Sequence, residues 1–432
     1  VGGKICMNSF LSEFEFFANH RENETAESKA LRQKGLDQFN ELGLPKRSWE
    51  AWQYSDFSKL ESAHFRLPKE NAFPSTIPES IPITSDFNKI VFVNDFFQKQ
   101  MSSFPDSIIV RTIMDISAEE SSEILSKLNT NENPFHALNT ALMSSKILIE
   151  IPKGIILEKP IHILFQTTDI SDLQMTHPRV RVKTGSNSEA TIIEHYIGKC
   201  KTEYFQNIVT EFSLANNARL NHIRIQEDGI NATHVASTHY QLESDASLHG
   251  MHFASGSKLY RQDISVSLNG EGSEANLNGL CLSNEMQHLD HFVTMDHDQP
   301  QCVSRQLFKY ILSDSSSGAF NGRIVVSPDS QKTDAIQTNK NLLLSESALM
   351  NSNPQLEIYA NDVKCAHGST SGQMDPEAIF YLQSRGLNKN EARLLLINGF
   401  AREVIQNIQD KATQEYLDNL LNDWLDKQKN KM

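Results

Sequence analysis

A repeat runs through the middle of the chain, in the segments Ala190-Thr191-Ile192, Ala218-Arg219-Leu220, Ala246-Ser247-Leu248 and Ala275-Asn276-Leu277. Each segment places a small residue before an apolar run, and the segments begin 28 or 29 residues apart. A fixed period of about 20 to 50 residues is typical of stacked units that bury their faces against their neighbours. The repeat therefore favours a β-solenoid with a small residue at each corner. A large antiparallel sandwich with evenly spaced hairpins is the alternative that the spacing leaves open.

Further strand-like runs surround the repeat. Between its members lie β-branched runs such as 208–212 and 264–268, and similar runs begin at about residue 146. Turns rich in Gly, Asn, Ser and Asp separate them, and few segments before about residue 370 have helical periodicity. The pattern of Leu248-His249-Gly250 and Leu277-Asn278-Gly279 returns at Phe320-Asn321-Gly322, which suggests a later member of the repeat. We therefore assign residues 146–370 to a mainly β core.

The regions on either side of this core have helical patterns. In the N-terminal region, 1–145, helices are predicted over 27–41, 117–128 and 134–143, with a Pro-rich connector over 66–90. The aromatic residues Trp49, Trp52 and Tyr54 are interpreted as packing beneath a turn that contains proline. In the C-terminal region, 371–432, three helices are predicted: one capped by Asp375, one with a capping box of Asn388 and Glu391, and one over 413–427.

Length and composition limit the classes of function. The 432 residues include 40 basic and 54 acidic side chains, a net charge of −14, and 39% are hydrophobic. This composition indicates a folded protein and argues against nucleic acid or an anionic membrane as partners. No run approaches the roughly 18 to 20 apolar residues of a membrane span, and no secretory signal is visible. The five cysteines are far apart without a CxxC pair, so we expect a reducing, cytoplasmic location.

Most motifs of well-known chemistry are missing from the sequence. It contains no Walker-type phosphate loop, no GxSxG elbow and no HExxH helix. The carboxylates Asp296 and Asp298 would suit glycan chemistry on a β-solenoid, but an acidic pair of this kind is more often a solvated turn. Nine of the fifteen histidines lie between His195 and His297. We interpret them as surface or coil-stacking residues rather than a preformed metal site, because no Asp, Glu or Cys completes a ligand set.

One pair of residues near the end of the β region is distinctive. Cys365 and His367 are two residues apart, so both side chains share one face of an extended strand. A thiolate and an imidazole together suit a borderline-soft metal such as iron or zinc. Lys364 would modestly favour the thiolate. The alternative is a buried cysteine beside a structural histidine.

Several further segments together form a recognisable pattern: Gly43-Leu44-Pro45, Arg47, Glu50-Ala51-Trp52, Tyr54, Asn341 to Leu344, Pro354 to Ile358, Asp362 to Gly368, Phe380 to Gly386 and Ala392 to Phe400. In these segments the chain resembles the SufB/SufD family of iron–sulfur cluster assembly proteins, and its SufD branch most closely. SufB-type chains have a cysteine where this sequence has Asn339, and a glutamate where it has Gly368. Both differences favour the SufD branch.

The resemblance implies a right-handed parallel β-helix flanked by helical regions. It also implies a non-catalytic scaffold that pairs with SufB through the β-helix and binds the SufC ATPase through its C-terminal helices. Such a chain has a role in iron supply and nascent cluster formation. It binds no cofactor tightly, and iron or a cluster is shared only transiently with SufB. His367 is carried over as the functional residue, with Cys365 as a candidate second ligand or a packed support. The resemblance leaves a homodimer of the isolated chain open, and a stand-alone β-helix enzyme acting on polysaccharide is the alternative function.

Overall fold

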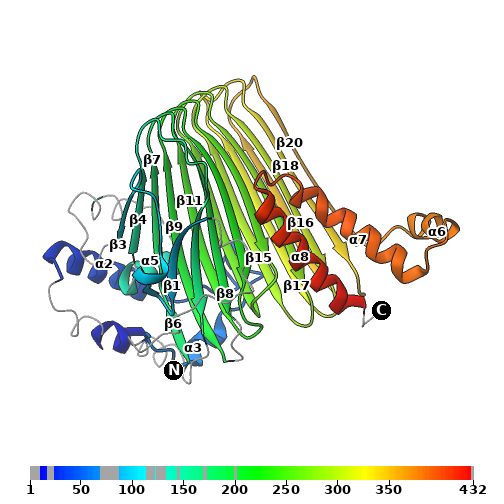
Figure 1. Ribbon diagram of the computed structural model, residues 1–432, viewed down its shortest axis with the longest axis horizontal. Coiled ribbons are helices and arrows are strands. Elements are labelled where there is room, and N and C mark those ends of the chain that lie inside the picture. The colour runs from blue at the N-terminus through cyan, green and yellow to red at the C-terminus, as the bar shows by residue number, and fades with distance from the viewer. Residues whose placement is uncertain are drawn as a thin grey trace.

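The computed structural model describes residues 10–16, 24–68, 87–112, 122, 133–143, 146–168, 173–198 and 202–429. Two ten-stranded sheets face each other in it, and the chain passes from one sheet to the other as it advances (Figure 1). Nearly all neighbouring strands are parallel, and each pairs with the strand two positions away in sequence. The predicted parallel β-helix is therefore confirmed, and the antiparallel sandwich is wrong.

The first sheet carries the strands β2-β1-β5-β8-β10-β12-β14-β16-β18-β20 in this order. Their bounds are β1 (Asn88–Val93), β2 (Phe96–Phe97), β5 (Ile161–Thr167), β8 (Glu189–Gly198), β10 (Arg219–Glu227), β12 (Ser247–Ala254), β14 (Glu274–Ser283), β16 (Val303–Leu312), β18 (Asp334–Leu343) and β20 (Lys364–Gly372). The second sheet runs β19-β17-β15-β13-β11-β9-β7-β4-β3, with β6 paired to β9. Its strands are β3 (Ile109–Thr112), β4 (Lys146–Ile151), β6 (Gln174–Thr176), β7 (Arg179–Thr184), β9 (Tyr204–Leu214), β11 (Thr233–Leu242), β13 (Leu259–Leu268), β15 (His288–His297), β17 (Ser317–Val326) and β19 (Leu349–Ile358).

Small buried residues line one corner of the β-helix, as the repeat predicted, but the predicted register needs a correction. The corner residues are Ser188, Ala218, Ala246, Ser273, Cys302 and Thr333. The carbonyl of each accepts a backbone hydrogen bond from the start of the next coil, at 2.8–3.1 Å. Ala190 and Ala275 lie two residues further along, beside Leu220 and Leu248. The segment from Phe320 lies in the second sheet, so it does not continue the repeat.

The N-terminal helices cover part of the second sheet. They are α2 (Ala26–Leu42), η1 (Glu50–Trp52), α3 (Ser58–Ser62) and α5 (Pro134–Leu142), whereas the short helix η3 (Lys99–Met101) packs against β1 of the first sheet. Thr25 caps α2 and Gly43, at φ +70°, ends it, so the helix predicted over 27–41 is confirmed. Trp52 packs edge-on against Phe57, and both rings contact Phe135, as the packing interpretation expected. Nearly all of the helix predicted over 117–128, and residues 69–86 of the Pro-rich connector, lie outside the described residues.

Three C-terminal helices follow the last strand: α6 (Pro376–Ser384), α7 (Lys389–Ile405) and α8 (Lys411–Lys429). The predicted caps are present, because Asp375 accepts from the amide of Glu377, and Asn388 and Glu391 form a capping box. The second half of α7 and all of α8 lie against the outer face of the first sheet, whereas α6 projects from the body (Figure 1). No helix in the described part of the chain is both long and apolar enough to cross a membrane.

Candidate functional site

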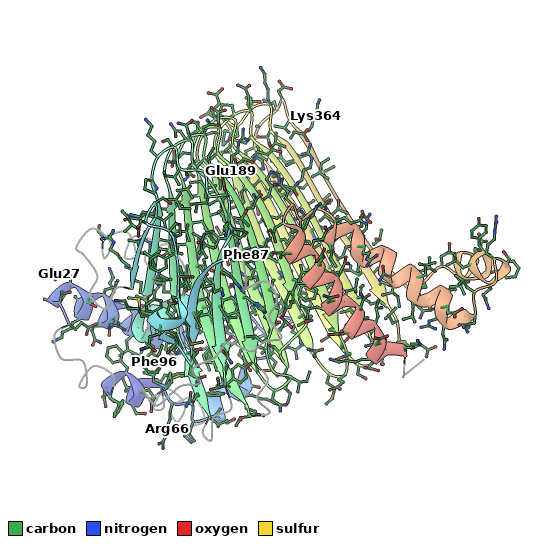
Figure 2. The ribbon with its side chains drawn as sticks, in the orientation of Figure 1. Glu27, Arg66, Phe87, Phe96, Glu189 and Lys364 are labelled. Carbon is green, nitrogen blue, oxygen red and sulfur yellow. The ribbon has the colours of Figure 1, made fainter. Side chains whose placement is uncertain are left out.

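The last coil leaves one end of the β-helix open. β20 pairs only with β18, and β19 pairs only with β17, so each is the edge strand of its sheet. Every residue of β19 and β20 is at least partly exposed. Figure 2 places Lys364, the first residue of β20, on the opposite side of the stack from Glu27 and Phe96. A row of unpaired backbone groups at such an edge is a surface on which another strand can pair.

The structure brings Cys365 and His367 to the interior face of this open coil. Their strand neighbours in β18 are Ala335 and Gln337, both of which are buried. Cys365 is half-buried and packs against the core, whereas the imidazole of His367 is exposed. The two residues therefore share a face, as their spacing predicted, but only His367 is freely accessible. Their role as metal ligands stays a prediction.

The thiol of Cys365 does not depend on Lys364 in the way that the sequence suggested. Burial raises its pKa above the usual value, and the nearby carboxylate of Asp334 acts in the same direction. A raised pKa keeps the sulfur protonated at neutral pH, and a thiol is a weaker metal ligand than a thiolate. In this chain alone, the thiol of Cys365 is therefore better suited to support His367 by packing than to bind a metal directly.

The described residues contain no group of three or more His, Cys, Asp or Glu side chains that could hold a metal ion. The interpretation of the histidines as surface residues is wrong for most of them, whereas the alternative of stacking between coils is right for pairs such as His222 and His252, whose ring centroids are 5.9 Å apart. Of the nine between His195 and His297, only His249 is exposed, and six are completely buried: His195, His222, His234, His252, His291 and His297. Burial lowers the pKa of His291 to about 3 and that of His297 to about 4, so both rings are neutral at pH 7.

A chain of buried charged groups crosses the interior between β8 and β11. Arg224 donates to Glu194 at 2.6 Å and lies 2.8 Å from His234, whose other ring nitrogen is 2.7 Å from Asp228. Burial alone would raise the pKa of Asp228, but hydrogen bonds from His234, Gln226 and Tyr204 outweigh it and lower that pKa. Sequence reasoning missed this network, because strand alternation alone does not tell which face of a strand is inside.

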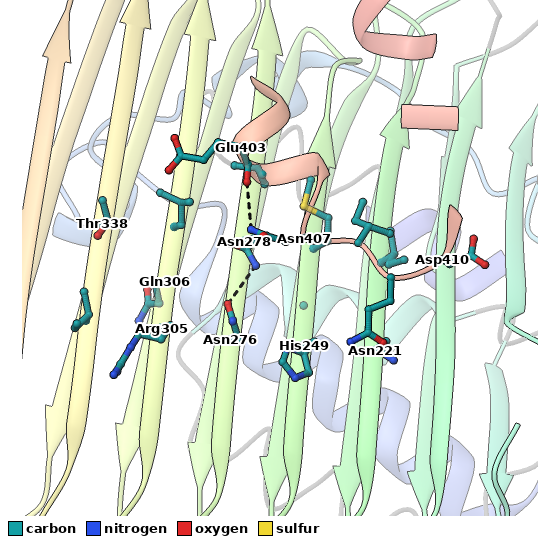
Figure 3. Close-up of a pocket in the computed structure, with 18 of the residues that line it drawn as sticks. Asn221, His249, Asn276, Asn278, Arg305, Gln306, Thr338, Glu403, Asn407 and Asp410 are labelled. Atoms are coloured by element: carbon teal, nitrogen blue, oxygen red, sulfur yellow. Dashed lines mark hydrogen bonds between the residues drawn. The ribbon is translucent and has the colours of Figure 1, made fainter. Parts of the chain in front are cut away.

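A pocket of about 490 Å³ lies outside the β-helix, between the first sheet and the α7–α8 connection. Its floor carries Asn221, His249, Asn276 and Arg305 in a row across β10, β12, β14 and β16 (Figure 3). Its arginine and lysine are paired, since Arg305 binds Asp334 at 2.8 Å and Lys340 binds Glu403 at 3.2 Å. The row faces outward, whereas Cys365 and His367 face inward, so this pocket is separate from the open end.

A second pocket, of about 1070 Å³, separates the Trp49–Trp52 segment from the outer face of the second sheet. The solvated-turn interpretation of Asp296 is wrong here, because Asp296 belongs to β15 and lines this pocket. Burial, assisted by the negative charge of Asp298, raises the pKa of Asp296 to about 6. Asp298, the other member of the acidic pair, is exposed beyond the strand.

A third surface lies on α6 and the first half of α7. Phe380 is 73% exposed, Tyr381 57% and Leu395 52%, and no residue of α6 is buried. Arg393 between them is half-buried, with its Nε enclosed, so it belongs to the helix packing rather than to this exposed surface. Large apolar groups gathered on a projecting element are typical of a protein-binding site.

These features define the class: a parallel β-helix with one open, strand-edged end and a projecting helical arm. Family models then identify it more narrowly. Residues 165–400 match the SufBD core domain of the SUF system for iron–sulfur cluster assembly, and residues 10–163 match the SufBD N-terminal region. The chain belongs to the SufBD family, as the resemblance predicted.

Individual relatives agree with this assignment. The chain is 31% identical to the SufD iron–sulfur cluster assembly protein of Escherichia coli, over 89% of this chain and 90% of that protein. It is 32% identical to a SufBD family assembly protein of Synechocystis, over 87% of this chain and 86% of the relative. SufD of Bacillus subtilis is 23% identical over 96% of this chain and 98% of its own length. The family match favours iron–sulfur cluster assembly over the alternative of a stand-alone β-helix enzyme acting on polysaccharide.

Proposed function

We propose that this chain is a non-catalytic scaffold subunit for iron–sulfur cluster assembly in the cytoplasm. It pairs with a SufB-type chain at its open end, binds a SufC-type ATPase through α6 and α7, and contributes to iron supply and nascent cluster formation. Iron or a cluster is its transient cargo, bound by His367 together with groups of the partner. The observation that carries this proposal is the exposed imidazole of His367 on the open edge strand β20.

Pairing through the open end is supported by the character of the two edge strands. Leu349 and Tyr359, at either end of β19, are 57% and 62% exposed, and β20 has no second neighbour. Apolar side chains beside unpaired backbone groups favour the addition of strands from another chain. The partner that we infer for this edge is a SufB-type chain, a member of the same family.

Binding of the ATPase by the C-terminal arm is supported by Phe380, Tyr381 and Leu395. The second half of α7 already has a partner, because Ile397, Ala401 and Val404 are buried in the cluster that covers the first sheet. The exposed groups lie on the part of the arm that leaves this cluster. An apolar helix surface of this kind suits a groove on another protein.

His367 is suited to bind cargo that only a complex can complete. A neutral imidazole is a common ligand of borderline metals, and Cys365 on the same face offers at most a second ligand. Since no third His, Cys, Asp or Glu of the described chain lies close enough, the remaining ligands must come from the partner. We assign Cys365 to support, because its thiol is half-buried and has a raised pKa.

The test is anaerobic reconstitution of the complex of this chain with SufB-type and SufC-type partners, followed by iron–sulfur absorbance. His367→Ala should leave assembly intact and abolish most cluster formation, and Cys365→Ala should have a milder effect. Exposed Met286 lies far along the chain from the open end, so Met286→Ala is the matched control. Full cluster formation by the assembled His367→Ala complex would refute the role of His367, and loss of assembly would make it structural.

A further inference from the structure

The interior of the β-helix changes character in its last two coils. Phe308 of β16 faces Phe320 of β17 across the interior, with ring centroids 5.1 Å apart. One coil later, Asn339 and Ser352 occupy the equivalent positions. Asn339 is the strand neighbour of Phe308, and Ser352 is the strand neighbour of Phe320. An aromatic contact between the sheets is thus replaced by a hydrogen bond of 2.8 Å.

Asn339 is the centre of a network that joins three strands. Its side-chain oxygen accepts from Ser352 of β19 at 2.8 Å and from Ser369 of β20 at 3.3 Å. The two serine hydroxyls are themselves 2.7 Å apart. The amide nitrogen of Asn339 donates to the carbonyl of Phe308 at 3.1 Å, which anchors the network in the coil below. The side chain is fully buried, although both serines belong to edge strands.

Asn341 extends this network along β20. Its amide nitrogen donates to the side chain of Asn339 at 2.6 Å, to the hydroxyl of Ser371 at 2.9 Å and to the carbonyl of Thr370 at 3.2 Å. The half of β20 that follows His367 is therefore fixed from below by two carboxamides. On its outer side β20 has no neighbouring strand.

We propose that Asn339 is a positioning residue: its carboxamide clasps the two edge strands β19 and β20 and so sets where His367 stands at the open end. This inference rests on the role proposed above for His367. We name Asn339, Asn341, Ser352 and Ser369 together the clasp. Apolar contacts lose their strength at an open end where water has access, whereas hydrogen bonds around a buried acceptor keep a fixed direction and length.

The chemistry of the clasp explains why a carboxamide suits this position. Three donors converge on one oxygen, so the position needs a strong acceptor, and the carbonyl of Phe308 needs a donor on the same side chain. Leu has nearly the same volume but offers neither group, and Asp keeps the acceptor while losing the donor. Replacing Asn339 by Leu and by Asp therefore separates the effect of the acceptor oxygen from the effect of the side-chain volume.

The first experiment uses the isolated full chain and measures amide hydrogen exchange. In Asn339→Leu, exchange in β20 should rise about ten-fold or more, since buried hydrogen bonds that hold a local element closed are lost, while exchange in β14 stays unchanged. The double variant Ser352→Ala with Ser369→Ala should give the same direction with a smaller rise and an unaltered thermal melt. Asn339→Asp keeps the acceptor but loses the donor to Phe308, so it should give a smaller rise than Asn339→Leu. Asn278→Leu, on the outer face of β14, is the matched control and should change nothing in β20.

The second experiment measures cluster formation by the same variants in the assembled complex. Asn339→Leu and the double serine variant should reduce the yield several-fold without loss of assembly, and Asn339→Asp should reduce it less than Asn339→Leu. Unchanged exchange in β20 of the Asn339→Leu chain overturns the clasp, and so does a normal cluster yield from a complex whose β20 exchanges rapidly. If His367→Ala forms clusters normally, the proposed function of His367 fails, whereas the exchange experiment still decides whether Asn339 holds β20.

Discussion

Glu194 and Arg224 show how single residues determine what the interior of this β-helix can hold. Both side chains are completely buried, and removing two such charges from water costs several kcal/mol each. The cost is offset because Glu194 also accepts from Thr210 at 2.8 Å and lies 3.6 Å from a ring nitrogen of His222. Burial alone would raise the pKa of Glu194, but the hydrogen bond with His222 and the charge of Arg224 outweigh it and lower that pKa. The carboxylate of Glu194 therefore stays charged. The pair is stable only while both partners are present.

We expect Arg224→Met to destabilise the protein by about 3 to 5 kcal/mol, because it leaves Glu194 charged and buried without its cation. The measurement is the free energy of unfolding from urea titration. Arg305→Met is the matched control, since Arg305 forms an ion pair with Asp334 in which both side chains are more than a third exposed. That change should cost less than about 1 kcal/mol. Equal effects of the two substitutions would contradict this assignment.

Asp296 gives a prediction for pH dependence. Its folded pKa of about 6 lies above the ordinary value of 3.8, so the folded state binds more protons between these limits. Stability from this group is therefore present below about pH 4 and is lost as the pH rises through 6. Asp296→Asn should raise the free energy of unfolding at pH 7 by about 1 to 2 kcal/mol and have little effect at pH 4. An equal gain at both pH values would mean that the carboxyl charge is not the cause.

The sequence predicted some of these residues and not others. The spacing of two between Cys365 and His367 placed both on one face correctly, because alternation holds in any extended strand. It could not tell that His222, His234 and His252 are inside, since polar side chains such as Glu194 and Arg224 also occupy inward positions here. The clasp was equally invisible, because Asn339 and Ser352 lie in opposite sheets and meet only where β18 and β19 face each other across the interior.

At the scale of elements, local signals were reliable and register was not. The residues just before the corner positions adopt left-handed backbone angles: Asn187, Asn217, Asp245, Gly272, Gln301 and Lys332. Asn, Asp and Gly tolerate this conformation best, so four of the six carry a signal that would have given the true register. The alignment on alanines used a weaker feature and was two residues wrong at Ala190 and Ala275. Helix caps such as Asn388 are local, and therefore they were predicted correctly.

Lys309 fixes the position of α7 on the first sheet. Its side chain is fully buried, and its ammonium group donates to the carbonyl of Phe400 at 2.8 Å, pairs with Glu403, and lies 4.2 Å from the ring centre of Phe400. Burial lowers the pKa of Lys309, although Glu403 opposes that effect. A buried cation with three partners on one helix turn holds that turn against β16.

We expect Lys309→Met to loosen α7 and α8 while the β-helix stays intact. Losing the charged hydrogen bonds should cost about 1 to 3 kcal/mol of local stability. Limited proteolysis within residues 406–410 and amide exchange in α8 are the measurements. Lys340→Met is the control, because Lys340 pairs with the same Glu403 but is 39% exposed, and it should have little effect. Unchanged proteolysis in the Lys309→Met chain would show that apolar packing alone holds the helix.

The whole molecule is asymmetric from end to end. Near its beginning the β-helix is flanked by helices α2 and α5, and along one face it is covered by α7 and α8. At the other end β19 and β20 carry free edges with exposed apolar groups. Exposed strand edges are a hazard for association, and natural proteins usually cover or charge them. We therefore expect another subunit to cover the open end formed by β19 and β20, where polar side chains occupy the interior.

The last prediction tests that end directly with Leu349→Lys and Tyr359→Lys together. Both side chains are more than half exposed, so the substitutions should leave the thermal melt of the isolated chain unchanged. Two cations at the edge should lower the affinity for a SufB-type partner by about 100-fold or more, since desolvating each unpaired charge opposes strand addition. Any homodimer of the isolated chain should dissociate as well.

Met286→Lys is the control, because Met286 is 76% exposed but lies between β14 and β15, away from the open end. Native mass measurement of the complex and of the isolated chain distinguishes the outcomes, and undiminished pairing by the double variant would place the partner on another face.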